Sequence, residues 1–289
     1  MSAGAAAAAL GAARIRAALA ARGEANISLA TGTSQFDMLN ALVEEPDIAW
    51  NRVTAFHLDE YVGLPFKHPA SLRAYLWQRF HRRLPRPPRA MHYLSGEGDP
   101  EAECERVGAL LERHPIDVCF AGIGENAHLA FNDPPADFHT RKPYLIVKLD
   151  EICRRQQYRE GWFRTPTAVP SRAISMSIAQ VMAARTIVVT APDDRKADAV
   201  QRALEGPVTN AVPSSVLQRH ADAHVFLDEA AAAKLTRLFE ANTVSLPCPL
   251  PTSPASGRSP ATRHPRKNGR SRGKSARSPQ PASTASRHG

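Results

Sequence analysis

The sequence predicts a Rossmann-like α/β fold, a single domain whose mostly parallel sheet has helices on both faces. Two observations predict it. Short apolar segments of strand length alternate with amphipathic segments of helix length from residue 25 to about residue 240. Polar turns directly follow three of the apolar segments, as in open sheets that bind ligands beyond the carboxyl ends of their strands. We expect residues 1–246 to form this domain and residues 247–289 to form a disordered basic tail.

The first elements follow from local signals near the start of the chain. The alanine-rich residues 5–22 predict a helix that ends before Gly23. Residues 27–30 predict a short strand that runs into a turn at residues 31–33. Ser34 is expected to cap the helix that follows, because serine accepts hydrogen bonds well from a first helical turn.

The later elements continue the alternation. Apolar runs predict strands at residues 53–58, 116–121, 144–149, 173–178, 186–190 and 224–227. Apolar residues at helical spacing predict helices at residues 69–80, 100–113, 194–205 and 229–239. Gly206 and Pro207 should end the third of these helices, because glycine and then proline commonly follow a helix.

The net charge of +9 belongs to the tail. Residues 247–289 hold nine Lys or Arg and no Asp or Glu, so residues 1–246 are neutral by formal count. The domain therefore offers no charge argument for nucleic-acid binding. The tail is rich in Pro, Ser, Ala and Arg and poor in large apolar residues, which predicts disorder. Such a tail could touch RNA, DNA or an anionic surface weakly, but we favour a solvated extension.

Cysteine usage and apolar runs bear on the compartment. The four cysteines are scattered without a Cys-x-x-Cys pair, which indicates a reducing compartment and no zinc ribbon. No uninterrupted apolar run approaches the roughly 20 residues that span a bilayer. The alanine-rich start carries Arg14 and Arg16, so we expect a helix that covers the sheet and not a secretory signal. We expect a cytoplasmic protein without a membrane partner.

The most informative segment runs from Gly122 to Pro135. It follows the apolar strand at 116–121 and begins Gly-Ile-Gly-Glu-Asn-Ala-His. Its glycines, Gly124 among them, let the backbone turn tightly and approach a ligand. His128 can gain or lose a proton near neutral pH, and Asp133 can orient it if the loop folds back. The residues alone fit a catalytic turn and an ordinary loop with one satisfied histidine equally well.

This segment resembles the glucosamine-6-phosphate deaminase family, whose relatives include the 6-phosphogluconolactonases. Three other segments resemble family motifs: residues 29–34 its phosphate loop, residues 53–64 its strand ending in Asp-Glu-Tyr, and residues 194–197 its segment with a phosphate-binding lysine. His128 is followed by Leu-Ala-Phe-Asn-Asp-Pro, which fits the deaminase branch better than the Thr-Ala-Ser-Leu-Phe-Pro of the lactonase branch. The resemblance covers the chain from about residue 25 to about residue 240.

The resemblance implies a phosphate site. Four residues of the first turn offer hydroxyls and free amides at a helix start, which can bind an anion: Thr31, Gly32, Thr33 and Ser34. Taken alone, they fit an ordinary capped helix start equally well. The resemblance adds Lys196 to the same phosphate, although the residues alone favour a solvated lysine. It also implies an arginine, for which we choose Arg155 with Arg154 as competitor.

The resemblance also assigns two proton transfers. In the family, the aspartate that matches Asp59 moves a proton between carbons 1 and 2 of the open-chain sugar. The histidine that matches His128 opens the ring, by taking the anomeric hydroxyl proton and returning it to the ring oxygen. By its own position at the end of an apolar strand, Asp59 fits both a general base and an ordinary loop acid.

Three positions depart from the deaminase pattern. Asn126 stands where the pattern usually has Asp, Ala127 where it has Gly, and Asp133 where it has Glu. Asn126 carries no charge, so it could only orient His128 or bind substrate. Asp133 is one methylene shorter, so its pairing with His128 survives only if it still reaches the ring. We place Asn126 and Asp133 with Asp59 and His128 in the catalytic site.

The favoured function is an aldose–ketose isomerase and deaminase that acts without a cofactor. It would convert glucosamine 6-phosphate and water into fructose 6-phosphate and ammonia, which makes it formally a hydrolase. Two alternatives stay open, namely hydrolysis of a sugar-phosphate lactone and a non-catalytic sugar-phosphate-binding regulator. The regulator is disfavoured, because a binding module needs no proton-transfer groups.

Two further expectations concern metals and assembly. His57 and Asp59 share a strand face and could join His128 as metal ligands. The resemblance implies no metal, however, and we expect none. The sequence leaves a homo-oligomer open.

Overall fold

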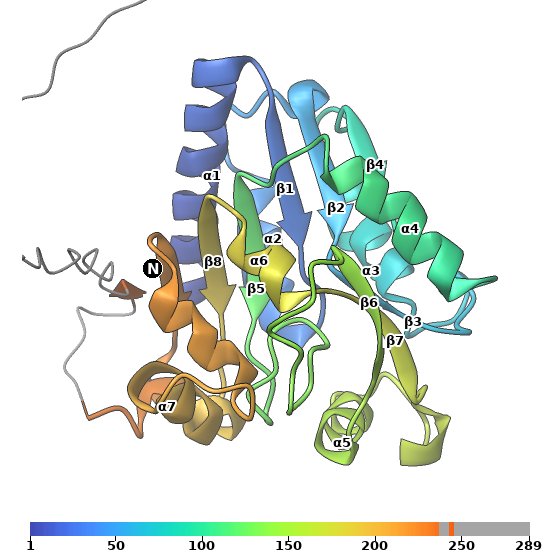
Figure 1. Ribbon diagram of the computed structural model, residues 1–289. Coiled ribbons are helices and arrows are strands. Elements are labelled where there is room, and N and C mark those ends of the chain that lie inside the picture. Colours follow the sequence, from blue (N-terminus) through green and yellow to red (C-terminus); the bar gives the residue numbers. More distant parts are fainter. Residues whose placement is uncertain (237–242, 246–289) are drawn as a thin grey trace, which may run out of the picture. The chain divides into compact units, whose positions relative to one another are not determined.

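The structure is a computed structural model that describes residues 1–236 and 243–245 (Figure 1). The basic tail predicted for residues 247–289 lies outside the described residues, as does the end of the last predicted helix. The helices are α1 (Ala3–Arg22), α2 (Phe36–Leu42), α3 (Leu72–Arg79), α4 (Pro100–Leu111), α5 (Glu151–Arg159), α6 (Ile178–Met182), α7 (Ala197–Glu205) and α8 (Glu229–Ala232). The strands are β1 (Ala25–Leu29), β2 (Val53–His57), β3 (Asp59–Tyr61), β4 (Ala90–His92), β5 (Val118–Gly122), β6 (Tyr144–Lys148), β7 (Arg172–Met176), β8 (Thr186–Thr190), β9 (Ala223–Phe226) and β10 (Thr243–Ser245).

The main sheet confirms the predicted fold class. Its strand order is β10-β9-β8-β5-β1-β2-β4, and the neighbours are parallel except for β10, which is antiparallel to β9. Successive side chains of a strand point to opposite faces of the sheet. In β5, Val118 and Phe120 therefore join the core beneath α1, α2 and α3, whereas Cys119 and Ala121 join the core beneath α4, α6 and α7.

A second, antiparallel sheet corrects the prediction for residues 144–149 and 173–178. These strands do not enter the main sheet but form β6 and β7, which pair with β3 in the order β3-β7-β6. The transition occurs at Leu58, whose N–H binds the Leu29 carbonyl of β1 while its own carbonyl accepts from Met176 of β7. Asp59 is thus the first residue that belongs to the small sheet. An apolar run shows that a strand is buried but not which sheet it joins.

The turn after β1 differs from the predicted capped helix start. A 3₁₀ turn at Thr33–Gln35 precedes α2, and among the described residues no side chain, that of Ser34 included, caps either element. Gly32 has φ +93°, a backbone conformation that L side chains rarely adopt. The Thr31–Ser34 segment, which follows β1, therefore lies at the carboxyl edge of the sheet.

Several element ends also shift. The helix predicted from residue 69 begins at Leu72, because the Ser71 hydroxyl accepts the Ala74 N–H and caps it there. The helix predicted from residue 194 begins with a 3₁₀ turn, and α7 proper starts at Ala197. The helix predicted at residues 229–239 is short, since α8 ends at Ala232. The short strands β3, β4 and β10 were not predicted.

Helix α1 is long and apolar enough to cross a membrane by length and composition. In the structure it is a core helix, as predicted for the start of the chain. Ala8, Ala12 and Ile15 are fully buried in the core that α1 shares with α2 and the main sheet. A core helix of a folded domain passes the same composition test as a membrane span.

Candidate active site

A cleft lies where β1, β2 and β5 end, as expected for the carboxyl edge of a parallel sheet. Segments following these strands line it together with residues from α5 and from the turn before α7. Seven predicted site residues line the cleft, and they are Thr31, Gly32, Thr33, Ser34, Asp59, His128 and Lys196. Four others do not, and they are Gly124, Asn126, Asp133 and Arg155. The structure therefore separates residues that line the cleft from residues that lie outside it.

The carboxyl group of Asp59 lines the cleft and has a raised pKa. Asp59 is 6% exposed. Burial, and then the neighbouring Glu60 carboxylate, raise the pKa of Asp59 to about 8, because both disfavour the ionised form. Near neutral pH the side chain of Asp59 is therefore mostly a neutral carboxylic acid.

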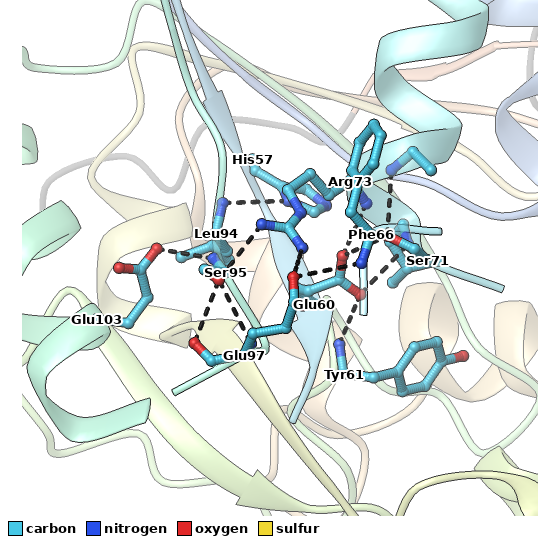
Figure 2. Close-up of polar contacts among 12 residues, drawn as sticks. His57, Glu60, Tyr61, Phe66, Ser71, Arg73, Leu94, Ser95, Glu97 and Glu103 are labelled. Carbon is cyan, nitrogen blue, oxygen red and sulfur yellow. Dashed lines mark hydrogen bonds and ion pairs between the residues drawn. The ribbon is translucent and has the colours of Figure 1, made fainter. Parts of the chain in front are cut away.

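Glu60, the residue after Asp59 in β3, binds the start of α3 through its side chain (Figure 2). Its fully buried carboxylate accepts hydrogen bonds from the backbone N–H of Tyr61 at 2.9 Å and of Arg73 at 2.8 Å, and from the Ser71 hydroxyl at 3.2 Å. Burial raises the pKa of Glu60 to about 7 even though these hydrogen bonds oppose the shift. Glu60 thereby ties β3 to the first turn of α3.

His128 lines the cleft, with Asp133 and Asn126 behind it. Its Nδ1 lies 2.9 Å from Asp133 Oδ1, so the shorter aspartate does reach the ring. Asn126 Nδ2 donates to the same Asp133 oxygen at 2.8 Å, and Asn126 Oδ1 accepts the backbone N–H of His128 at 3.1 Å. Asn126 and Asp133 therefore orient His128, which is the role expected for Asp133 if it reached the ring and one of the two roles left open for Asn126.

Hydrogen bonds favour the ionised form of the Asp133 carboxylate. Burial raises the pKa of Asp133, but hydrogen bonds from His128, from Asn126 and from the Asp150 amide outweigh burial and lower it overall. An ionised Asp133 accepts a hydrogen bond, so Nδ1 of His128 carries the ring proton. Nε2 is then the nitrogen that can accept a proton from a substrate.

The predicted alternative metal set does not form around His57. That ring is fully buried, its Nδ1 accepts the Leu94 N–H at 3.4 Å, and burial lowers its pKa to about 3. Among the described residues, ligand atoms of His128, Asp133 and Cys153 lie within 4.8 Å of one another. Asp133 is already engaged by His128, so a cation there would have to replace that hydrogen bond.

Gly124 supports the histidine and does not line the cleft. A Cβ built at this position would lie 2.3 Å from both Cε1 and Nε2 of the His128 ring. The ring packs directly on the glycine backbone, so the predicted ligand contact of Gly124 is replaced by a contact with His128. The absence of a side chain at residue 124 therefore sets where the imidazole lies.

Gly124→Ala should lower turnover by about 10²–10⁴-fold, the typical contribution of an acid–base group, because the added methyl must displace the imidazole. The steady-state rate with folding checked by circular dichroism measures this. Gly108→Ala is the matched control, since its Cβ would meet only Pro143 at an ordinary 3.5 Å. Full activity of the Gly124 variant would show that the ring position does not matter.

Lys196 and the first polar turn make the cleft suitable for an anion. Lys196 is 3% exposed, and its ammonium makes no hydrogen bond or ion pair with any residue that the structure describes. Burial lowers the pKa of Lys196, and the carboxylates of Glu160 and Glu125 oppose that shift. The hydroxyls and amides of the Thr31–Ser34 turn line the same cleft. A buried lysine that makes no ion pair with a described residue, in the same cleft as such a turn, can bind a negatively charged group.

Neither Arg155, chosen as the phosphate arginine, nor its competitor Arg154 lines the cleft. Arg155 is largely exposed and pairs with Glu151 one helical turn away, while Arg154 binds the Val169 carbonyl. Arg159, at the end of α5, lies instead on a hollow that adjoins the cleft and shares Thr33, Ser34 and Lys196 with it. Its guanidinium binds Glu125 Oε2 at 2.5 Å.

Sequence reasoning also missed four polar residues of the cleft, which are Gln35, Gln156, Gln157 and Glu160. Gln35 donates to the Ala121 carbonyl at 3.2 Å, and its buried Oε1 has no hydrogen-bond partner among the described residues. Gln156 and Gln157 lie in α5 and Glu160 directly follows it, and a 2.8 Å hydrogen bond links Gln156 to Glu160. Only the position of Gln35 directly after the polar turn could have indicated it, since nothing in local spacing directs α5 toward the cleft.

Comparisons with known proteins point to one family. The model of the family described as glucosamine-6-phosphate isomerases/6-phosphogluconolactonase matches residues 2–226. A glucosamine-6-phosphate deaminase of Streptococcus suis is 38% identical over 211 residues, which are 72% of this chain and 87% of that protein. Glucosamine-6-phosphate deaminase 2 of Bacillus subtilis is 36% identical over 232 residues, which are 78% of this chain and 92% of that protein.

Solved structures of two proteins resemble this chain in fold. The structure of a monomeric glucosamine-6-phosphate deaminase has a TM-score of 0.74 and 29% identity, and the match covers 81% of this chain and 95% of that one. A 6-phosphogluconolactonase from Thermotoga maritima has a TM-score of 0.61 and 15% identity, over 74% of this chain and 89% of that one. At 15% identity the second likeness speaks for the fold alone.

Proposed function

The chain belongs to the family of glucosamine-6-phosphate isomerases and 6-phosphogluconolactonases, and from that premise we propose that it is a glucosamine-6-phosphate deaminase. Its substrate class is an amino-sugar phosphate, and the net reaction consumes water and releases ammonia. Residues 1–246 would carry the activity, and the tail from residue 247 would have no part in it. The reaction as proposed requires no cofactor.

One observation carries the proposal, namely that proton-transfer groups and a buried lysine with no ion pair among the described residues line the same cleft. Asp59 and His128 are the proton-transfer groups, and Lys196 with the Thr31–Ser34 turn offers donors to an anion. A sugar with a phosphate at carbon 6 and its reacting carbons at 1 and 2 needs both kinds of group in one cleft. Arg159, in the adjoining hollow, would reach the phosphate by leaving Glu125.

The steps follow from the groups present. With the phosphate held by Lys196, Nε2 of His128 takes the anomeric hydroxyl proton and returns it to the ring oxygen, which opens the ring. Asp59 then takes the proton from carbon 2 and delivers it to carbon 1, while a proton of the amino group passes to the oxygen of carbon 1, which leaves an imine at carbon 2. Water adds to that imine and ammonia departs, so the product is the ketose phosphate. A substrate ammonium near Asp59 would favour the ionised carboxylate that this role needs.

Ammonia release tests the proposal directly. The purified chain should release ammonia from glucosamine 6-phosphate in step with the appearance of fructose 6-phosphate. A panel with the other amino-sugar epimers and a sugar-phosphate lactone defines the substrate. Turnover of the lactone without ammonia from any amino sugar would replace this proposal with lactone hydrolysis, and binding without any turnover would replace it with a regulator.

Lys196→Ala should raise KM for glucosamine 6-phosphate about tenfold or more, because a hydrogen bond to a charged group contributes roughly 1.5–3 kcal/mol. KM for glucosamine without phosphate should change little. Initial rates over a range of both sugars measure the difference. Lys234→Ala is the control, since that half-exposed lysine pairs with Asp198 away from the cleft. Equal use of both sugars by the wild type would contradict the phosphate assignment.

Glu60→Gln should move the pH dependence of kcat/KM to lower pH. Asp59 must be ionised to accept the carbon-bound proton, so kcat/KM should rise with pH through about 8 in the wild type. The Glu60 charge contributes to that raised pKa, so its removal should lower the midpoint of the rise. Glu97→Gln is the control, because Glu97 binds Arg73 but is not a cause of the Asp59 shift. An unmoved or raised midpoint would contradict this reading of Asp59.

A further inference from the structure

We propose that Asp150 is a positioning residue for the His128–Asp133 pair, acting through Asn126. This inference rests on the proposed function for its kinetic test but not for its spectroscopic one. Asp150 does not line the cleft, so it acts only through its neighbours. Neither charge patterning nor motif spacing distinguished it in the sequence.

The Asn126 amide lies between two carboxylates. Its Nδ2 donates to Asp133 Oδ1 and to Asp150 Oδ2, both at 2.8 Å. Its Oδ1 accepts the His128 N–H at 3.1 Å. Because one end of the amide faces only acceptors and the other faces a donor, a single orientation of Asn126 satisfies all three contacts.

Asp150 holds this arrangement at three points. Its backbone N–H donates to Asp133 Oδ2 at 2.8 Å, so it also fixes the second oxygen of the carboxylate that binds His128. Its Oδ2 accepts from Asn126, and its Oδ1 accepts the Cys153 N–H at 2.7 Å as the cap of α5. One residue thus ties the acid–base pair to the start of the helix that brings Gln156 and Glu160 into the cleft.

The presence of Asp150 also explains why an amide is required at residue 126. An aspartate there would place a third carboxylate 2.8 Å from two others, where no donor separates them. Like charges at that distance disfavour full ionisation of the group. Asn126 and Asp150 therefore form a matched donor–acceptor pair, and a change of either residue alone mismatches the contact.

Asp150→Asn isolates the contact with Asn126, because asparagine is as good a helix cap as aspartate. The NH₂ group introduced at residue 150 would face the NH₂ group of Asn126, so two donors would meet without an acceptor between them. If Asn126 rotated to escape, its oxygen would face Asp133 and its NH₂ would face the His128 N–H. Either outcome loosens the carboxylate that orients the histidine. Asp99→Asn is the matched control, since Asp99 caps α4 through Glu101 with no link to the site.

We expect Asp150→Asn to lower kcat by about tenfold or more, as for the loss of a hydrogen bond to a charged group, with KM nearly unchanged. Asp99→Asn should leave both constants as in the wild type. The double variant Asn126→Asp/Asp150→Asn should lose less activity than the product of the two single losses, because the reversed pair again sets a donor against an acceptor. Losses that simply multiply would overturn the pairing.

A second readout does not depend on the substrate. In proton NMR, the His128 Nδ1–H that binds Asp133 should give a downfield resonance in the wild type and in Asp99→Asn. The resonance should broaden or move in Asp150→Asn. Asp150→Ser, which keeps a cap but is too short to reach Asn126, should behave in the same way. If Asp150→Ser or Asp150→Asn keeps both the resonance and full kcat, Asp150 is only a helix cap. A wild type that shows the resonance but releases no ammonia would instead count against the proposed function alone.

Discussion

Replacing Asp59 with asparagine is expected to reduce ammonia release by about 10²–10⁴-fold, the typical contribution of a positioned acid–base group. Asparagine keeps the shape of the side chain but cannot take the proton from carbon 2. Substrate binding should survive, because Lys196 and the Thr31–Ser34 turn, which are proposed to hold the phosphate, are unchanged. Initial rates and equilibrium binding of a non-reacting sugar phosphate separate the two effects. Unchanged deamination by this variant would show that another group moves the proton.

The same substitution should stabilise the fold at alkaline pH. The pKa of Asp59 is about 8 in the folded chain against 3.8 for an ordinary aspartate, so the folded state holds the proton over that interval. Its contribution to stability is therefore full below about pH 4 and is lost as pH rises through about 8. Asparagine never ionises, so the free energy of unfolding of the variant should exceed that of the wild type by a margin that grows from pH 5 to pH 8.5. Urea unfolding over this pH range measures the margin. Asp37→Asn, at an exposed aspartate, should show no such growing margin.

His128→Gln should slow the cyclic substrate by about 10²–10⁴-fold, while an analogue that lacks the ring-closing hydroxyls should react almost normally. The reason is that the proposed role of His128 ends once the ring is open, whereas Asp59 is needed for both substrates. The ratio of the two rates in each variant measures this. His139→Gln, at an exposed histidine, should leave the ratio unchanged. An equal slowing of both substrates would mean that His128 also serves the later proton transfer.

The helix α5 shows where prediction from the sequence stopped. Arg155 and Arg159 are four residues apart and so share one face of the helix, which means that periodicity cannot rank them. Only the placement of α5 shows Arg155 paired with Glu151 in solvent and Arg159 beside the cleft. The same placement brings Asp150 against Asn126, across 24 residues of chain.

The sequence by itself determined the alternation of strands and helices and the three polar turns, whereas the resemblance of its motifs to a family singled out Asp59, His128 and Lys196. The elements follow from local rules, because an apolar period of two or of about three and a half and a glycine turn are visible in neighbouring residues. Only the tertiary structure decided that β6 and β7 leave the main sheet, that Asn126 and Asp133 stand behind His128, and that Asp150 holds them. Strand pairing, burial and charge-to-charge distance depend on residues far apart in the chain, and the folded backbone alone brings them together.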